Sequence, residues 1–307
     1  MNKCLLLFVI AICGTHASSI NAERANRIVE GATASVNQFQ YMVSLQKISE
    51  LQSYTRGHRC GGALVTLQHA VTAASCNFDI INGVSVAIAP VEHRVFAGAV
   101  TLTSDNSPYH IRNIINITVH PDYYASSLLV NDIAVIFLES AFSSTIAPVL
   151  LPIRDAGVTE PTPCYVSGWG AQNDTATASV QLMYLQKRIQ EQQNCRAYYG
   201  SLPVGPLNVV DSMICAFGDQ QTPFSGCTGD IGNPLVCSGY LNGILVRSKK
   251  CIVSPDSEVY TRISSYTTWI NGTITGQGSG AASTFQPGMV VLAVIAIAQI
   301  IIANVIN

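Results

Sequence analysis

Short apolar runs broken by turn residues are the feature of this chain that most restricts its fold. The runs are rich in Val, Ile and Tyr, and Gly, Pro, Asn and Asp separate them; clear examples are 40–46, 63–74, 131–138, 164–170 and 241–248. Repeated short strands with turn residues between them are typical of an antiparallel sandwich or barrel. We therefore predict an all-β domain from about Arg24 to Thr275. A helix near 264–272, with Ser264 or Ser265 as its N-cap, is expected to close it.

The N-terminus has the pattern of a secretory signal peptide. Lys3 precedes the apolar run Leu5–Cys13, and a stretch of small residues follows. We expect residues 1–17 to be removed, with cleavage as late as residue 22; a buried N-terminal strand is the alternative. Such a leader accounts for part of the low charge of the chain, because charged residues make up only 11%, against about 25% in an average soluble domain.

The C-terminus has the pattern of a lipid-anchor signal. Residues 276–288 form a linker of small residues, and 289–307 form a hydrophobic tail that no Lys or Arg follows. This arrangement is typical of a glycosylphosphatidylinositol (GPI) attachment signal, here with Ser279 or Gly280 as the attachment position. A transmembrane helix is the alternative. We expect an extracellular protein of the secretory pathway, anchored in the membrane of the cell surface through this tail.

The cysteines and sequons agree with an extracellular location. Of 10 cysteines, Cys4 and Cys13 belong to the expected signal peptide, and the even number that remains favours disulfides. The residues alone do not select the pairing. No Cys-x-x-Cys pair is present, and we expect neither a metal nor a cofactor. Candidate glycosylation sites are Asn116, Asn173 and Asn271. The formal net charge of -2 gives no basis for nucleic-acid binding.

Several segments resemble, in order, the motifs of one protein family. They are 27–31 (RIVEG), 59–76 (RCGGALVTLQHAVTAASC), 131–138 (NDIAVIFL), 164–170 (CYVSGWG) and 227–237 (CTGDIGNPLVC). Over residues 28–272 the chain resembles the trypsin/chymotrypsin-like serine proteases (peptidase S1). The resemblance implies two packed antiparallel six-stranded β-barrels with a C-terminal helix, in a domain at 28–275 that follows a short propeptide at 18–27. It also implies four disulfides, Cys60–Cys76, Cys164–Cys237, Cys195–Cys215 and Cys227–Cys251.

Two of the three catalytic positions of that family have changed. The family's mechanism needs a hydroxyl nucleophile, an imidazole base and a carboxylate that orients the imidazole. The resemblance assigns the carboxylate to Asp132, but Ser75 stands where the family has His, and Ile231 where it has Ser. Serine cannot act as a base near neutral pH, and isoleucine has no nucleophilic atom. We expect neither His58 nor His69 to replace the base, because triad geometry tolerates little displacement.

Other parts of the family's machinery are retained. The backbone amides of Gly229 and Ile231 are candidates for an oxyanion hole with two donors. Arg27, Ile28 and Asp230 match the activation site, where cleavage releases an amine at Ile28 that pairs with the buried Asp230. In the alternative, Asp230 accepts hydrogen bonds from backbone amides in an uncut chain.

The positions that line the family's substrate pocket are altered; they are Ser225, Val246, Arg247, Ser248 and Glu258. Glu258 replaces a glycine of the pocket wall, and we expect its side chain to narrow the pocket and to pair with Arg247 or Lys250. In the alternative both charges face solvent, where such a pair contributes little. Asn233 also replaces a glycine, and we interpret it as a further obstacle to substrate.

Loss of the base and the nucleophile leads to our first hypothesis. It is a non-catalytic serine protease homologue that binds a protein partner, such as a protease, a zymogen or an inhibitor. An active serine endopeptidase that uses substitute residues is the alternative from the enzyme class. A cell-surface interaction module unrelated to proteolysis is the third hypothesis, because a fold does not fix a function.

Overall fold

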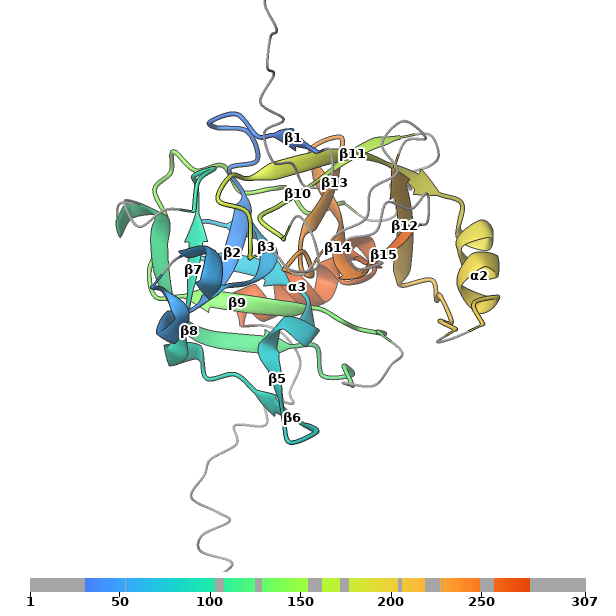
Figure 1. The fold of residues 1–307 in the computed structure, drawn as a ribbon, viewed down its shortest axis with the longest axis horizontal. Coiled ribbons are helices and arrows are strands. Elements are labelled where there is room, and N and C mark those ends of the chain that lie inside the picture. Colours follow the sequence, from blue (N-terminus) through green and yellow to red (C-terminus); the bar gives the residue numbers. More distant parts are fainter. Residues whose placement is uncertain are drawn as a thin grey trace, which may run out of the picture.

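The computed structural model describes residues 31–52, 54–102, 108–124, 129–153, 162–171, 177–203, 206–218, 227, 229–248 and 257–276. The expected signal peptide, propeptide and tail lie outside these residues, as do the linker after Gly276 and the residues Arg27, Ile28, Asn173, Ser225, Lys250 and Cys251. Most of the regular elements are strands, and they form two packed barrels (Figure 1).

Six strands close into the first barrel. Their order is β2 (Met42–Lys47), β3 (His58–Thr66), β4 (His69–Thr72), β9 (Ala134–Leu138), β8 (Ile111–Val119) and β7 (His93–Ala97), and neighbours are antiparallel. Compact apolar side chains fill the interior, among them Val43, Leu45, Val71, Val95 and Val135, all fully buried. These are residue types that fit a pleated, buried surface. The predicted run at 63–74 covers the end of β3 and all of β4.

The second barrel is built in the same way from the later part of the chain. Its order is β11 (Met183–Gln190), β10 (Pro163–Gly168), β13 (Pro234–Cys237), β14 (Tyr240–Arg247), β15 (Glu258–Arg262) and β12 (Met213–Gly218). The antiparallel pairing of β12 with residues 187–190 of β11 closes the ring, and β1 (Ala32–Thr33) pairs with Met183 and Tyr184 at the start of β11. The expected pair of six-stranded barrels is confirmed.

Alternation along β11 places one charged side chain inside the second barrel. Met183, Leu185 and Ile189 are buried, whereas the intervening Gln186 and Arg188 are exposed. Lys187 shares the inward side with the apolar residues and is only 1% exposed. A lysine in this position requires a partner, because an isolated charge in a barrel interior is strongly unfavourable.

In the described part of the chain, three α-helices accompany the barrels: α1 (Tyr54–Gly57), α2 (Gln192–Gly200) and α3 (Thr267–Thr275). The expected C-terminal helix is confirmed as α3, but its predicted cap is wrong. Ser264 and Ser265 belong to a preceding 3-10 turn, and Tyr266 is the N-cap, with no side-chain hydrogen bond. Among the described residues, no helix is both long enough and apolar enough to span a membrane.

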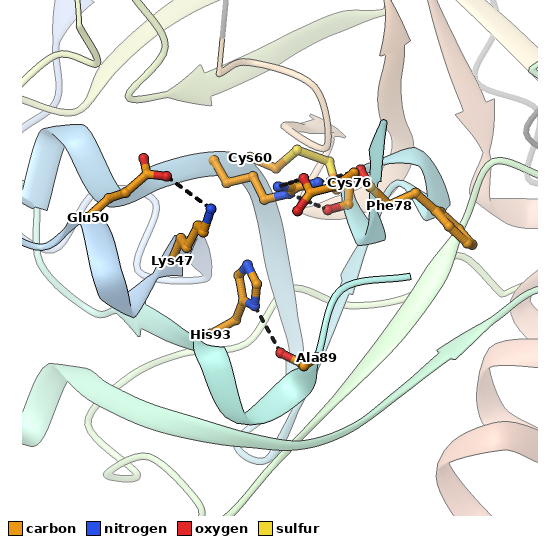
Figure 2. Close-up of polar contacts among 9 residues, drawn as sticks. Lys47, Glu50, Cys60, Cys76, Phe78, Ala89 and His93 are labelled. Carbon is orange, nitrogen blue, oxygen red and sulfur yellow. Dashed lines mark hydrogen bonds and ion pairs between the residues drawn. A yellow bond between two sulfur atoms is a disulfide. The ribbon is translucent and has the colours of Figure 1, made fainter. Parts of the chain in front are cut away.

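A two-stranded hairpin lies at the edge of the first barrel. It consists of β5 (Phe78–Ile81) and β6 (Val84–Ala87), and it projects away from the barrels (Figure 1). Arg59 of β3 fixes its base: the guanidinium donates to the carbonyls of Cys76 and Phe78 and pairs with Asp79 (Figure 2). The same view shows the His93 ring bonded to the Ala89 carbonyl. The chain that follows Ser75 is therefore tied firmly to the barrel.

Three of the four expected disulfides are present in the structure. They are Cys60–Cys76, Cys164–Cys237 and Cys195–Cys215. Cys227 is also disulfide-bonded, and its expected partner, Cys251, lies outside the described residues. The first disulfide matters for the site, because it joins β3 to the 3-10 turn Ala74–Asn77 that holds Ser75.

Candidate functional site

The three positions that the sequence assigns to the catalytic site, 75, 132 and 231, lie near one another although they are far apart in sequence. Ser75 follows β4, Asp132 precedes β9, and Ile231 lies in the loop before β13. The backbone amide of Ser75 donates to Oδ1 of Asp132 at 2.7 Å. Next to Ser75, the sulfur of Cys76 lies 3.7 Å from the carbonyl oxygen of Ile231. Gly61 of β3 also donates its amide to that carbonyl at 2.9 Å, which links the loop to the first barrel.

Asp132 is a buried carboxylate at the centre of this arrangement. Its side chain is fully buried, and burial raises its pKa to about 6, although hydrogen bonds from Ser75 and the amide of Ala74 act in the opposite direction. Among the described residues, Oδ2 has no hydrogen-bond partner. Thr261 of β15 donates its hydroxyl to the backbone carbonyl of Asp132 at 2.8 Å, so the second barrel helps to fix its position.

Ile231 has an apolar side chain at this position. The side chain is half-buried and packs against the apolar cores of both barrels. Glycines flank it because Gly229 and Gly232 have φ angles of +91° and +88°, which other residues rarely adopt. The loop therefore keeps a sharply turned backbone around a side chain that has no reactive atom.

His58 is positioned as a structural residue. The carbonyl of Gly229 only accepts, so Nε2 of His58 donates to it at 3.0 Å, and Nδ1 accepts from the Ser44 hydroxyl at 2.7 Å. Burial lowers the pKa of His58 to about 4. Both ring nitrogens are thus in use, and the ring is neutral at pH 7. His69 bonds to Thr66 and contacts Phe137 in a T-shaped ring arrangement, at the end of β4 remote from Ser75.

Asp230 is buried beside Ile231 and accepts three hydrogen bonds. The amide of Gly170 and the side-chain nitrogen of Asn233 reach Oδ1 at 3.1 and 2.7 Å, and the amide of Cys227 reaches Oδ2 at 2.7 Å. Burial is the largest influence on its pKa and raises it to about 6, and the nearby Glu258 acts in the same direction. We interpreted Asn233 as an obstacle to substrate, but in the structure its side chain donates a hydrogen bond to this carboxylate.

Glu258 lies inside the second barrel and has a partner that the sequence interpretation missed. Its carboxylate forms an ion pair with Nζ of Lys187 at 3.0 Å, and the Tyr260 hydroxyl donates to the same oxygen at 2.6 Å. Both charged side chains are at most 2% exposed. The neighbouring carboxylate raises the pKa of Tyr260 further than burial alone does. The inward alternation of β11 is the signal that identifies Lys187.

The remaining altered positions of the pocket region are partly described. Val246 is buried, and Arg247 places its guanidinium 5.7 Å from the ring centre of Tyr199. A cavity of about 20 Å³, enough for one water molecule, lies beside Asp230, Asn233 and Glu258. The described part of this region is therefore filled mainly by the protein's own side chains.

Two packed, closed, six-stranded antiparallel barrels are the fold of the chymotrypsin-like serine proteases. Ser75, Asp132 and Ile231 lie where the two barrels meet. The family model called Trypsin matches residues 28–270, and the chain belongs to this family.

Relatives with full-length similarity agree with this assignment. Chymotrypsin-like elastase family member 1 of Macaca fascicularis is 30% identical over 280 residues, which cover 88% of this chain and 97% of that protein. The Bos taurus protein of the same name is 30% identical over 281 residues, with coverages of 88% and 98%. Among solved structures, neuropsin, a serine protease expressed in the limbic system of mouse brain, superposes with a TM-score of 0.65. It is 26% identical and covers 80% of this chain and 99% of its own.

Proposed function

We propose that this protein is a non-catalytic serine protease homologue that acts by binding another protein. The support is the residue type at two positions that resemble the family's base and nucleophile: Ser75, whose amide bonds to Asp132, and Ile231, whose carbonyl lies near Cys76. Loss of either group in a related mechanism lowers turnover by on the order of 10⁶. Both ring nitrogens of His58 are hydrogen-bonded, and His69 lies at the end of β4 that is remote from Ser75, so neither is placed to compensate.

A fluorophosphonate probe tests the absence of a nucleophile. We expect no covalent labelling of the purified protein, either uncut or cut after Arg27, under conditions that label an active elastase completely. Peptide hydrolysis by the same samples should equal the buffer blank. Labelling that maps to a residue within 28–275, and that disappears when this residue is changed, would support the active endopeptidase instead.

The proposed partner is a component of a proteolytic system, namely a protease, a zymogen or an inhibitor. The support is the retained two-barrel scaffold, whose described pocket region is filled from within by Glu258 and Lys187. Domains of this family commonly bind proteins such as substrates and inhibitors. Affinity capture with the folded extracellular part, followed by binding of each purified candidate, tests this step. Direct binding of a partner from outside these three classes would favour the third hypothesis, a surface module unrelated to proteolysis.

Surface attachment through the tail at 289–307 is a further part of the proposal. Its support is the sequence pattern of small residues, spacer and hydrophobic end. Phosphatidylinositol-specific phospholipase C should release the protein from intact cells. Retention in the membrane, with the tail still detectable by mass spectrometry, would establish a transmembrane anchor.

Glycosylation is proposed at Asn116 and Asn271. Both side chains are exposed, one on β8 and the other on α3, so the glycan would extend into solvent. Treatment with an N-glycanase should convert both residues to Asp, as seen by peptide mass spectrometry. Unmodified Asn at both positions would exclude this part of the proposal.

A further inference from the structure

The carboxamide of Asn233 lies in a closely fitting site between the two barrels. Asn233 and Asp230 are 2% and 3% exposed, and Nδ2 of Asn233 donates to Oδ1 of Asp230 at 2.7 Å. On one side, a Cβ atom on Gly168 of β10 would lie 1.9 Å from Nδ2. On the other side, a Cβ atom on Gly61 of β3 would lie 1.8 Å from Oδ1. A side chain at either glycine would therefore displace this carboxamide.

Asp230 is enclosed in a similar way. A Cβ atom on Gly170 would lie 2.2 Å from the carboxyl group, so that glycine makes room for it. The amides of Gly170 and Cys227 and the carboxamide of Asn233 supply three donors to its two oxygens. All three donors are neutral and come from residues 170–233, which exist in the same form whether or not the chain is cut near its N-terminus.

The backbone of the loop is fixed through the same residues. Asn233 donates its amide to the Asp230 carbonyl at 3.0 Å, and its own carbonyl accepts from the amide of Leu245 at 2.9 Å. Gly232 donates to the Leu245 carbonyl at 2.8 Å. The side-chain and backbone bonds of Asn233 thus hold the 229–233 loop against β14.

We propose that Asn233 makes the conformation of the 229–233 loop independent of proteolytic maturation. In this proposal the carboxamide holds Asp230 in the uncut chain, and a new amine at Ile28 is not needed to order the loop. The binding surface would then be present as soon as the protein folds, and cleavage after Arg27 would not act as an on-switch. The inference concerns loop order alone and holds whether or not the protein has catalytic activity.

The test compares uncut and cut forms of the same protein. Replacing residues 23–27 with an enterokinase recognition sequence allows cleavage that leaves Ile28 as the first residue. Hydrogen exchange of the 229–233 amides should differ by less than about threefold between the two forms, and the melting temperatures should agree within about 1 °C. A gain in protection of tenfold or more on cutting, which corresponds to about 1.4 kcal/mol, would overturn the proposal. This comparison needs no amino-acid substitution within the domain.

A variant adds a second readout. Asn233→Ala removes the carboxamide but leaves the backbone bonds, and it should lower the melting temperature of the uncut form by roughly 5 °C. Cutting to expose Ile28 should then restore protection of the loop in this variant only. Asn242→Ala is the matched control, because Asn242 is a buried asparagine of the same barrel that bonds to Tyr240 and Cys237. It should lower the stability of both forms equally. The proposal would be overturned if cutting changed the protection of the 229–233 amides equally in Asn233→Ala and Asn242→Ala.

Discussion

Ile231 packs at the junction of the two barrels, in the loop before β13. Its side chain contacts the cores of both barrels, so replacing it with serine removes apolar contacts on two sides. We expect Ile231→Ser to lower the free energy of unfolding by about 1–2 kcal/mol, without producing peptide hydrolysis. Urea denaturation and a peptide assay measure the two effects. Ile231→Val, which keeps the branched shape, should cost less, and a stabilising Ile231→Ser would contradict the packing argument.

Asp132 reduces stability at neutral pH. Burial raises its pKa from 3.8 to about 6, so the folded state favours the protonated form. The stability that this group contributes is complete below pH 3.8 and is lost as pH rises through 6. Asp132→Asn keeps an acceptor for the Ser75 amide and removes the charge. We therefore expect the variant to have a higher free energy of unfolding than the unchanged protein at pH 7. At pH 5 this difference should be smaller by about 1 kcal/mol.

Urea denaturation between pH 5 and 8 measures this difference for Asp132→Asn. Asp122→Asn is the control, because Asp122 is exposed. Its denaturation profile should run parallel to that of the unchanged protein. A destabilising Asp132→Asn at pH 7 would indicate that the ionised carboxylate has a cationic partner in solution.

At the scale of elements, β11, β12 and β15 together decide the interior of the second barrel. Lys187 of β11 lies opposite Gly218 of β12. Two residues earlier on β12, Ala216 lies opposite Glu258 of β15. The ladder thus brings the two charges to the same side of the sheet, where they pair. A buried pair contributes little net stability, but loss of one partner leaves an unpaired charge inside the barrel.

Substitution of the two partners measures this coupling. Lys187→Met should lower the free energy of unfolding by about 3–5 kcal/mol, because the buried carboxylate of Glu258 would lose the ammonium group of Lys187. The double variant Lys187→Met with Glu258→Gln should recover most of that loss, since neither member of the pair would then carry a charge. Denaturant titration of the four proteins gives the coupling energy. Additive losses would show that the two side chains act independently.

Helix α2 shows where element prediction from sequence failed. Its nine residues are mostly polar, and only Cys195 and Tyr199 are buried. Those two are four residues apart, which is helical spacing, but two apolar positions are too few to distinguish a helix from a loop. The disulfide from Cys195 to Cys215 and the bond from Tyr199 to the Ser257 carbonyl fix this segment, and both are long-range contacts.

At the scale of the whole molecule, His58 connects the two halves. It links Ser44 of the first barrel to Gly229 in the loop before β13. Burial lowers its pKa from 6.5 to about 4, so its contribution to stability is complete above pH 6.5 and is lost as pH falls toward 4. When the pH falls from 7 to 5, the free energy of unfolding of the unchanged protein should decrease by about 2 kcal/mol more than that of His58→Gln, because glutamine does not titrate.

Urea denaturation at the two pH values checks this expectation for His58. Gln keeps a donor for the Gly229 carbonyl, so the stability of the variant at pH 7 should stay close to that of the unchanged protein. Parallel pH profiles, or an imidazole pKa above 6 by NMR, would contradict the buried neutral ring.

The sequence by itself determined the fold class and the residue types at positions 75, 132 and 231. Strand alternation and ordered motifs are local, and the residue types at 75 and 231 can be identified without coordinates. Only the tertiary structure decided which buried polar groups meet. Lys187 pairs with Glu258, and Asn233 enters a space between Gly61 and Gly168, because strand register and barrel closure bring together residues that are distant in sequence. Register depends on every ladder in the two barrels, so no short segment specifies these contacts.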